Sequence, residues 1–179
     1  MTKPPSGKPP FTPVNDLTRI TPGVSAEIKI AIADALMAFS GMEANAEIVI
    51  WAAAGLSYEA GRRLTRMDAR AKFDRVREFY ELYEIAKNNP LPGAFWESIK
   101  LLCEARNAIA HGVWVTVDGS VPLASSFKAS KQQPLETIGG EAFPLARLQA
   151  IQRQCTRIAR RFAQDEGRLQ AQRERPPQE

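Results

Sequence analysis

Residues 104–114 read EARNAIAHGVW, and in this stretch the spacing of apolar residues changes from a helical to a strand period. The apolar residues that share one helical side, at about 100° per residue, are Phe95, Ile99, Leu102, Cys103 and Ala110. Gly112 is typical of a helix end. The following VWVTV, residues 113–117, has the β-branched and aromatic residues that strands favour. The stretch therefore predicts a helix that ends here and leads directly into a strand.

The rest of the chain has mainly helical periods. Helices are predicted over about residues 24–40, 43–65, 68–88, 94–111 and 144–169. Gly41 interrupts the pattern between the first two, and NNPLPG, residues 88–93, is a strong turn signal. The middle of the second helix, IVIWAAA at residues 48–54, is apolar all round. Such a helix has to be covered on more than one side, by the bundle or by another subunit.

A small β-hairpin is predicted before the last helix. Its strands are residues 113–117 and 120–123, joined by a two-residue turn at Asp118-Gly119. Pro122 makes the hairpin an edge structure, and residues 124–142 are polar and contain glycine, as expected of an exposed loop. The predicted fold class is therefore all-α, a bundle of about five helices with a short β-hairpin inserted before the last helix.

The length of 179 residues suggests one domain. Five prolines by position 13 predict a disordered, Pro-rich arm over residues 1–23. The helical domain is expected over residues 24–169, followed by a disordered tail over residues 170–179. A formal net charge of +4 permits an anionic partner without requiring one.

Several classes of protein are disfavoured by composition. The longest apolar run, residues 48–56, is too short to span a bilayer, and the N-terminus has no apolar core of a signal peptide. A cytoplasmic protein with no membrane partner is expected.

Cys103 and Cys155 fall on apolar helical sides and are expected to be buried thiols. With one histidine and two cysteines there is no zinc-like ligand spacing, so no metal or other cofactor is expected.

Arg106 falls near the middle of the apolar side of the helix that precedes Gly112. A guanidinium keeps its charge, so its burial is costly unless a partner compensates. Two explanations are open: this side of the helix is not fully buried, or Arg106 meets an anion. The anion would be a carboxylate such as Glu47 or Glu59, a group on a second copy of the chain, or a phosphate.

His111 is the only histidine of the chain. It either stabilises the last carbonyl groups of its helix or acts through its imidazole. Asn107 lies one turn earlier on the same helical side, where it orients His111 or is an ordinary surface amide. Arg106 is five residues before His111, roughly 140° away around a regular helix. Within one copy the two converge only if the helix ends near Ala110 or the arginine bends round, whereas a two-fold dimer relaxes this constraint.

An arginine with a polar residue after it, separated by four residues from a histidine near the end of a late helix, resembles the signature of the HEPN superfamily (higher eukaryotes and prokaryotes nucleotide-binding). The matching residues are Arg106, Asn107 and His111. The resemblance covers roughly residues 24–165. It implies a homodimeric, metal-independent endoribonuclease, in some members a toxin with an antitoxin partner or part of an antiviral system. Other members have lost catalysis and bind partners or act as scaffolds.

In some toxins of this superfamily, a tyrosine two residues after the histidine is modified by a partner nucleotidyltransferase. Val113 stands at that position here. The resemblance therefore does not extend to this mode of regulation, although it still includes RNA cleavage.

The candidate catalytic residues Arg106, Asn107 and His111 suit RNA cleavage on chemical grounds as well. The reaction removes a proton from a 2′-hydroxyl, gives one to the 5′-leaving oxygen and stabilises extra charge on phosphorus. An imidazole ordinarily has a pKa of about 6.5 and serves as acid or base near neutral pH. A guanidinium has paired donors that match phosphate oxygens, and an amide orients either group. No metal is required.

Two groups of arginines are further candidates for contact with an RNA backbone. The first, four cations in nine residues, comprises Arg62, Arg63, Arg66 and Arg70, although Asp68 and Asp74 dilute its field. The second lies on the polar side of the last helix and comprises Arg153, Arg157, Arg160 and Arg161. Both are expected to be solvated faces, with an RNA track as the alternative. No aromatic pattern of an RNA-recognition sheet is present, so base-specific reading is not expected.

Three hypotheses follow from these residues. The first is a homodimeric ribonuclease with His111 transferring protons, Arg106 binding phosphate and Asn107 orienting. The second is a non-catalytic helical module that binds RNA, a nucleotide or a partner protein, since a second histidine is lacking. In the third, Arg106 only specifies the dimer by pairing across it.

Overall fold

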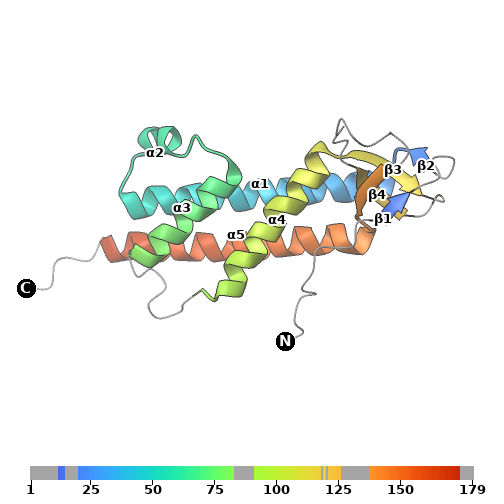
Figure 1. Cartoon of the computed structure of the whole chain (residues 1–179). Coiled ribbons are helices and arrows are strands. Elements are labelled where there is room, and N and C mark those ends of the chain that lie inside the picture. The colour runs from blue at the N-terminus through green and yellow to red at the C-terminus, as the bar shows by residue number, and fades with distance from the viewer. Residues whose placement is uncertain are drawn as a thin grey trace, which may run out of the picture. The chain divides into compact units, whose positions relative to one another are not determined.

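A computed structural model describes residues 12–14, 20–82, 91–117, 119, 121–125 and 138–173 (Figure 1). The helices in this part are α1 (Ala26–Ala54), α2 (Tyr58–Leu64), α3 (Ala69–Leu82), α4 (Gly93–His111) and α5 (Leu145–Arg173). The strands are β1 (Thr12–Val14), β2 (Ile20–Pro22), β3 (Val113–Val117), β4 (Val121–Ser125) and β5 (Ile138–Ala142). The described residues thus confirm the predicted fold class, a five-helix arrangement with a small set of antiparallel strands before the last helix.

The chain divides into two compact units. The first, here called the sheet unit, comprises residues 1–33 and 107–149; the second, the helical unit, comprises residues 34–106 and 150–179. The boundary between them passes through α1, α4 and α5. On α4 it falls between Arg106 and Asn107.

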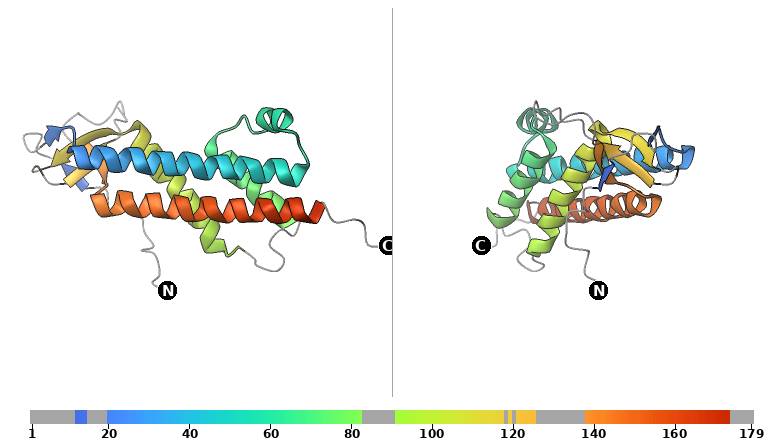
Figure 2. Two further views of the ribbon diagram at one scale, coloured as in Figure 1. Left: turned by 180° about the vertical axis from the view of Figure 1, so that it is seen from behind. Right: turned by 45° about the vertical axis from the view of Figure 1, so that its right-hand side comes forward.

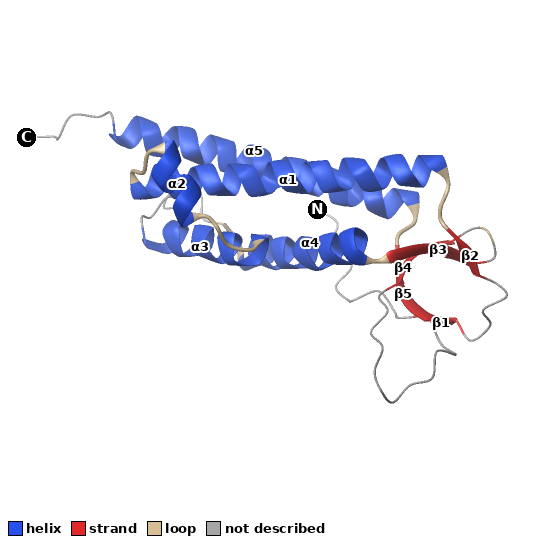
Figure 3. Cartoon of the chain, turned by 90° about the horizontal axis from the view of Figure 1, so that it is seen from above, coloured by secondary structure: helices blue, strands red, loops and turns tan. Residues whose placement is uncertain are grey.

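The helical unit has two layers. Within it, α1 and α5 lie side by side, and α3 and α4 lie against one side of this pair (Figures 2 and 3). Phe73 of α3 is the central contact, with its ring centroid 6.0 Å from that of Phe39 on α1 and 6.3 Å from that of Phe162 on α5. Phe162 also meets Phe95 of α4 at 6.1 Å. All four helices therefore bury their apolar sides against one aromatic cluster.

Helix α1 runs without interruption through Gly41, so the predicted helix end at this residue is wrong. A single glycine inside a helix costs only about 1 kcal/mol relative to alanine. Burial of Phe39 and Met42, on either side of Gly41, outweighs that cost. The predicted second helix over 43–65 is also corrected. It is the end of α1, followed by Gly55 in the left-handed region (φ 67°) and the short helix α2.

The exposed side of α1 within the helical unit carries no charge. Its exposed residues are Met37, Ser40, Gly41, Ala44 and Ile48. Helices of soluble proteins usually place charged residues on the side that faces water. The row overlaps the apolar segment 48–54 only at Ile48, whereas Val49, Ile50 and Ala53 of that segment are buried.

The sheet unit holds one antiparallel sheet with strand order β1-β5-β4-β3-β2. The predicted hairpin is present as β3 and β4, paired from Val113↔Ser125 to Val117↔Val121. This register leaves three residues between the strands instead of the expected two-residue turn. Val115 and Leu123 pair directly and are buried.

Three predictions for this region differ from the structure. Pro122 lies in β4, an interior strand and not an edge, where its carbonyl accepts a hydrogen bond from the backbone N–H of Phe143 at 2.9 Å. Part of the expected exposed loop over 124–142 is paired, since β4 includes residues 124 and 125 and β5 covers 138–142. The expected disordered arm over 1–23 contributes β1 and β2. Long-range pairing of this kind leaves little periodic signal in short, proline-containing segments.

Helix α5 extends to Arg173, into the expected disordered tail over 170–179. Residues 174–179 lie outside the described part of the chain, as do 83–90, which include the end of the predicted third helix.

Substitution of alanine at two glycines is predicted to change the free energy of unfolding in opposite directions. At Gly41 an added Cβ meets no atom within 4 Å, so Gly41→Ala should raise the free energy of unfolding by about 1 kcal/mol. At Gly112 an added Cβ would lie 2.5 Å from the Ala108 carbonyl oxygen and 2.8 Å from the Ala124 Cβ. Gly112→Ala should therefore lower the free energy of unfolding by about 1–3 kcal/mol. Urea unfolding followed by circular dichroism measures both; equal signs would contradict the packing described.

Candidate functional site

His111 is the last residue of α4, and its side chain is exposed. The last α-helical hydrogen bond runs from the Gly112 backbone N–H to the Ala108 carbonyl, and the chain enters β3 at the next residue, Val113. Trp114 turns back toward the helix, and its indole N–H donates to the Ile109 carbonyl at 3.1 Å. One of the last carbonyls of α4 is thus satisfied by an indole, and the imidazole of His111 faces solvent.

Trp114 also packs against Phe143, with ring centroids 5.7 Å apart. Behind Phe143, the guanidinium of Arg147 lies 4.2 Å from the centroid of the phenyl ring and forms an ion pair with Glu141. Trp114 therefore acts as a packing residue of the sheet unit. It anchors the start of β3 to the end of α4.

Arg106 is half-buried, and its guanidinium carbon lies 5.9 Å from the centroid of the Phe39 ring. This separation is within the range of a cation–π contact. Both residues belong to the helical unit. The side of α4 that carries Arg106 is thus not fully buried, which is the first of the two explanations given above, and the guanidinium lies beside an aromatic ring.

Asn107 is exposed and, like His111, belongs to the sheet unit. Arg106 and His111 of one copy could approach one another if the helix ended near Ala110. This early end does not occur, because α4 continues through His111. On a regular helix the two point roughly 140° apart. Asn107 and His111, one turn apart, share a side.

The arginines at 62, 63, 66 and 70 are all exposed, and three of them line two different hollows. Arg62 and Arg66 line an open hollow of about 570 Å³ together with Glu47, Asp68 and Lys72. The guanidinium carbon of Arg62 also lies 5.7 Å from the centroid of the Tyr58 ring. Arg70 lines a different hollow, of about 270 Å³, between α3 and α4. Each hollow is lined by three cations and two carboxylates, so acidic groups dilute the positive charge in both.

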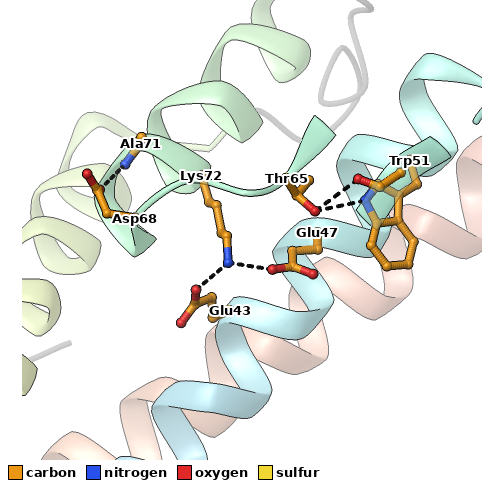
Figure 4. Close-up of polar contacts among 8 residues, drawn as sticks. Glu43, Glu47, Trp51, Thr65, Asp68, Ala71 and Lys72 are labelled. Carbon is orange, nitrogen blue, oxygen red and sulfur yellow. Dashed lines mark hydrogen bonds and ion pairs between the residues drawn. The ribbon is translucent and has the colours of Figure 1, made fainter. Parts of the chain in front are cut away.

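A buried lysine that the sequence analysis did not single out lies beside the first hollow. The Lys72 ammonium is 2.5 Å from one carboxylate oxygen of Glu43 and 2.5 Å from one of Glu47 (Figure 4). Burial lowers the pKa of Lys72, but hydrogen bonds and the charges of the two glutamates outweigh it, so that the pKa is raised. Glu47, one of the carboxylates considered for Arg106, is therefore bound to Lys72. A Glu-x₃-Glu pair facing α3 would have been the sequence signal.

A second buried charge cluster joins α3 and α5. The carboxylate of Asp165 is fully buried and accepts hydrogen bonds from the Tyr80 hydroxyl at 2.5 Å, Arg161 at 2.6 Å and Arg168 at 2.9 Å. Burial, followed by the hydrogen bond to Asp165, raises the pKa of the Tyr80 hydroxyl above its ordinary value. Each donor compensates part of the cost of burying the carboxylate. The cluster is a structural link and presents no reactive atom to solvent.

Cys103 and Cys155 are both free thiols in the helical core, as predicted. Burial raises the pKa of Cys103 to about 11 and that of Cys155 to about 12. Neither thiol is a ready nucleophile near neutral pH, because the thiolate is the reactive form.

Among the residues described, no group of three or more histidine, cysteine or acidic side chains is arranged to hold a metal ion. In the same part of the chain, no helix combines the length and apolar character that crossing a membrane requires. Comparison of the chain with models of protein families, with curated proteins and with solved structures returned no match.

The Lys72 bridge predicts a stability effect. Lys72→Met leaves two partly buried carboxylates without their cation, so we expect the free energy of unfolding to fall by about 2–3 kcal/mol. The matched control removes the whole bridge by adding Glu43→Gln and Glu47→Gln, and should recover most of the loss.

The pH dependence of this effect follows from the raised pKa of Lys72. The bridge contributes fully below the ordinary value of 10.5 and is lost as pH rises through the raised pKa. The difference between wild type and Lys72→Met should therefore be constant near neutral pH and shrink only in strong alkali. Urea unfolding at several pH values measures it; a difference that vanished near neutral pH would contradict the assignment.

Proposed function

We propose that the chain is a metal-independent endoribonuclease of HEPN type that acts as a homodimer. The observation that supports this most directly is the exposure of His111, the only imidazole of the chain, at the end of α4. Asn107 is one turn earlier on the same side, and Arg106 precedes it on the same helix. This is the arrangement of residue types that the resemblance to HEPN proteins leads one to expect.

The proposed reaction is in-line transesterification. The 2′-oxygen of RNA attacks phosphorus as its proton passes to one imidazole, and the bond from phosphorus to the 5′-oxygen breaks as that oxygen takes a proton from an imidazolium. The products are a 2′,3′-cyclic phosphate and a 5′-hydroxyl. Arg106 stabilises the charge that develops on the phosphoryl oxygens. Because each copy has one histidine, two copies of His111 supply the base and the acid.

A second copy would also bring an arginine close to each His111. Arg106 and His111 of one chain point in different directions around the helix, so we propose that Arg106 of each copy serves His111 of the other. The uncharged row of α1 is the surface proposed for this contact. A two-fold axis between Gly41 and Ala44 brings Met37 of one copy against Ile48 of the other.

The alternative is a non-catalytic helical module that binds RNA, a nucleotide or a partner protein. The observation that favours it is the same angular separation of Arg106 and His111, which leaves a single copy without a complete phosphate site. Salt-sensitive binding of RNA with no products would support this alternative.

The catalytic proposal is tested with purified full-length chain and a fluorescein-labelled RNA of about 20 nucleotides, with products resolved on a denaturing gel. His111→Ala should reduce the cleavage rate by at least about 100-fold, since general acid–base catalysis contributes about 10²–10⁴. EDTA should leave the wild-type rate unchanged. Leu101→Ala, at another exposed position of α4, is the matched control and should cleave normally.

Two readouts keep this test decisive. Circular dichroism and the unfolding midpoint of His111→Ala should match those of wild type, which separates catalysis from helix capping. Products ending in a cyclic phosphate identify the proposed chemistry and exclude metal-dependent contaminants. Full activity of His111→Ala would discard the assignment.

The dimer surface is tested separately. Met37→Glu combined with Ile48→Glu places charges on the proposed contact and should convert a dimer into a monomer. The control is Leu82→Glu combined with Leu101→Glu, two exposed leucines on α3 and α4. Light scattering coupled to size-exclusion chromatography reports the mass. A wild-type monomer, or equal effects of both double variants, would remove this surface from the proposal.

A further inference from the structure

Helix α5 carries a row of exposed arginines with no acidic residue among them. Residues 145–164 contain five arginines and neither aspartate nor glutamate. Three of the five, Arg153, Arg157 and Arg160, are exposed and follow one another at steps of four and three residues. This spacing keeps them on one side of the helix, over a length of about 10 Å. We call these three residues the arginine row.

Three other arginines of α5 are used within the protein, whereas the row is not. Arg161 and Arg168 bind the buried carboxylate of Asp165, and Arg147 forms an ion pair with Glu141. For the arginine row, the described part of the chain contains no ion pair or hydrogen bond. Like charges one turn apart disfavour a helix by a few tenths of a kcal/mol. A partner of opposite charge removes this repulsion.

The surroundings of the row do not cancel its field. Helix α1 lies beside α5 in the helical unit, and its exposed residues between Met37 and Ile48 are uncharged (Figure 2). Glu43 and Glu47 of α1 are bound to Lys72. On α5 itself, Asp165 is neutralised within its buried cluster. Glu166, six residues beyond Arg160, accepts a hydrogen bond from the side chain of Gln170. The row therefore differs from the arginines at 62 and 66, whose hollow contains Glu47 and Asp68.

The chemistry of the row points to a chain of phosphates. Arginine presents paired N–H donors that match two phosphate oxygens, and α5 contains no lysine. Three guanidinium groups in a line match a repeating anion better than a single one. No exposed aromatic residue is described on α5, so stacking of bases is not provided.

From these observations we propose that the arginine row binds the phosphodiester backbone of one nucleic-acid strand without reading its sequence. The proposal rests on the proposed ribonuclease function, because the arginine row would hold the RNA strand that this enzyme cleaves. Its test is a binding measurement, so that it stands or fails separately from cleavage.

The test uses a fluorescein-labelled oligothymidylate of about 20 nucleotides, which has no 2′-hydroxyl and cannot undergo transesterification. Affinity is measured by fluorescence anisotropy with full-length chain over about 50–300 mM KCl. The test variant combines Arg153→Gln, Arg157→Gln and Arg160→Gln. The matched control combines Arg75→Gln, Arg77→Gln and Lys100→Gln. It removes the same formal charge from residues that are ion-paired with Glu78, Glu81 and Glu97.

Binding to single strands depends on salt with a slope of about −0.7 per phosphate contacted. Loss of three contacts should therefore make the slope of log affinity against log salt shallower by about 2. At about 100 mM KCl the affinity of the test variant should fall at least about 10-fold. The control should stay within about two-fold of wild type. Because the oligothymidylate cannot be cleaved, this measurement reports the strand site separately from the catalytic proposal.

Several results would overturn the proposal. Wild type that does not bind the strand, or equal losses in the two triple variants, would show that the row is not a binding site. If polyglutamate competes as well as the oligonucleotide, the row is a surface for an acidic protein instead. Tighter binding of a duplex than of the single strand would show that the proposed ligand, a single strand, is wrong. Single variants, each expected to change the slope by about 0.7, provide the answer if the triple variant does not fold.

Discussion

The contact between Phe73 and Phe162 holds the helical unit together. Phe162 is fully buried on α5 and meets Phe73 and Tyr80 of α3 and Phe95 of α4. Phe73 in turn meets Phe39 of α1. Because these rings come from four different helices, the position of each helix depends on the others. The exposed sides of α1 and α5 are then the faces left over once the aromatic residues have been buried.

Charge is handled in two contrasting ways in this unit. Lys72 and Asp165 are buried, and each is compensated by more than one partner of opposite charge or by hydrogen-bond donors. Such clusters fix the relative positions of helices, since breaking them leaves an uncompensated charge. The arginine row of α5 lies at the other extreme, exposed and without an acidic neighbour along the helix. The buried charges have partners within the protein and are structural. The exposed arginines of the row have none in the described part of the chain, and are therefore available to a ligand.

Much of the fold was predictable from local patterns, and the failures have identifiable causes. The helix ending at His111 and the following strand were predicted because Gly112 separates two different apolar periods. Gly41 was misread as a break, because the burial of its neighbours outweighs its low helix propensity. For the candidate site, sequence marked Arg106, Asn107 and His111 but not the cation–π contact with Phe39. That contact joins residues 67 positions apart, so no local pattern records it.

The order of amino acids alone determines which residues carry chemistry and how they are spaced along each helix: the single imidazole, the arginine five positions before it, and the four–three steps of the arginine row. These follow from the helical period, a local property of the backbone. Partners across the fold were decided only by packing. Glu47 meets Lys72, Asp165 receives three donors, and β5 and β1 join the hairpin. Such pairings are selected by the total free energy of the packed chain, because each depends on segments that are distant in sequence.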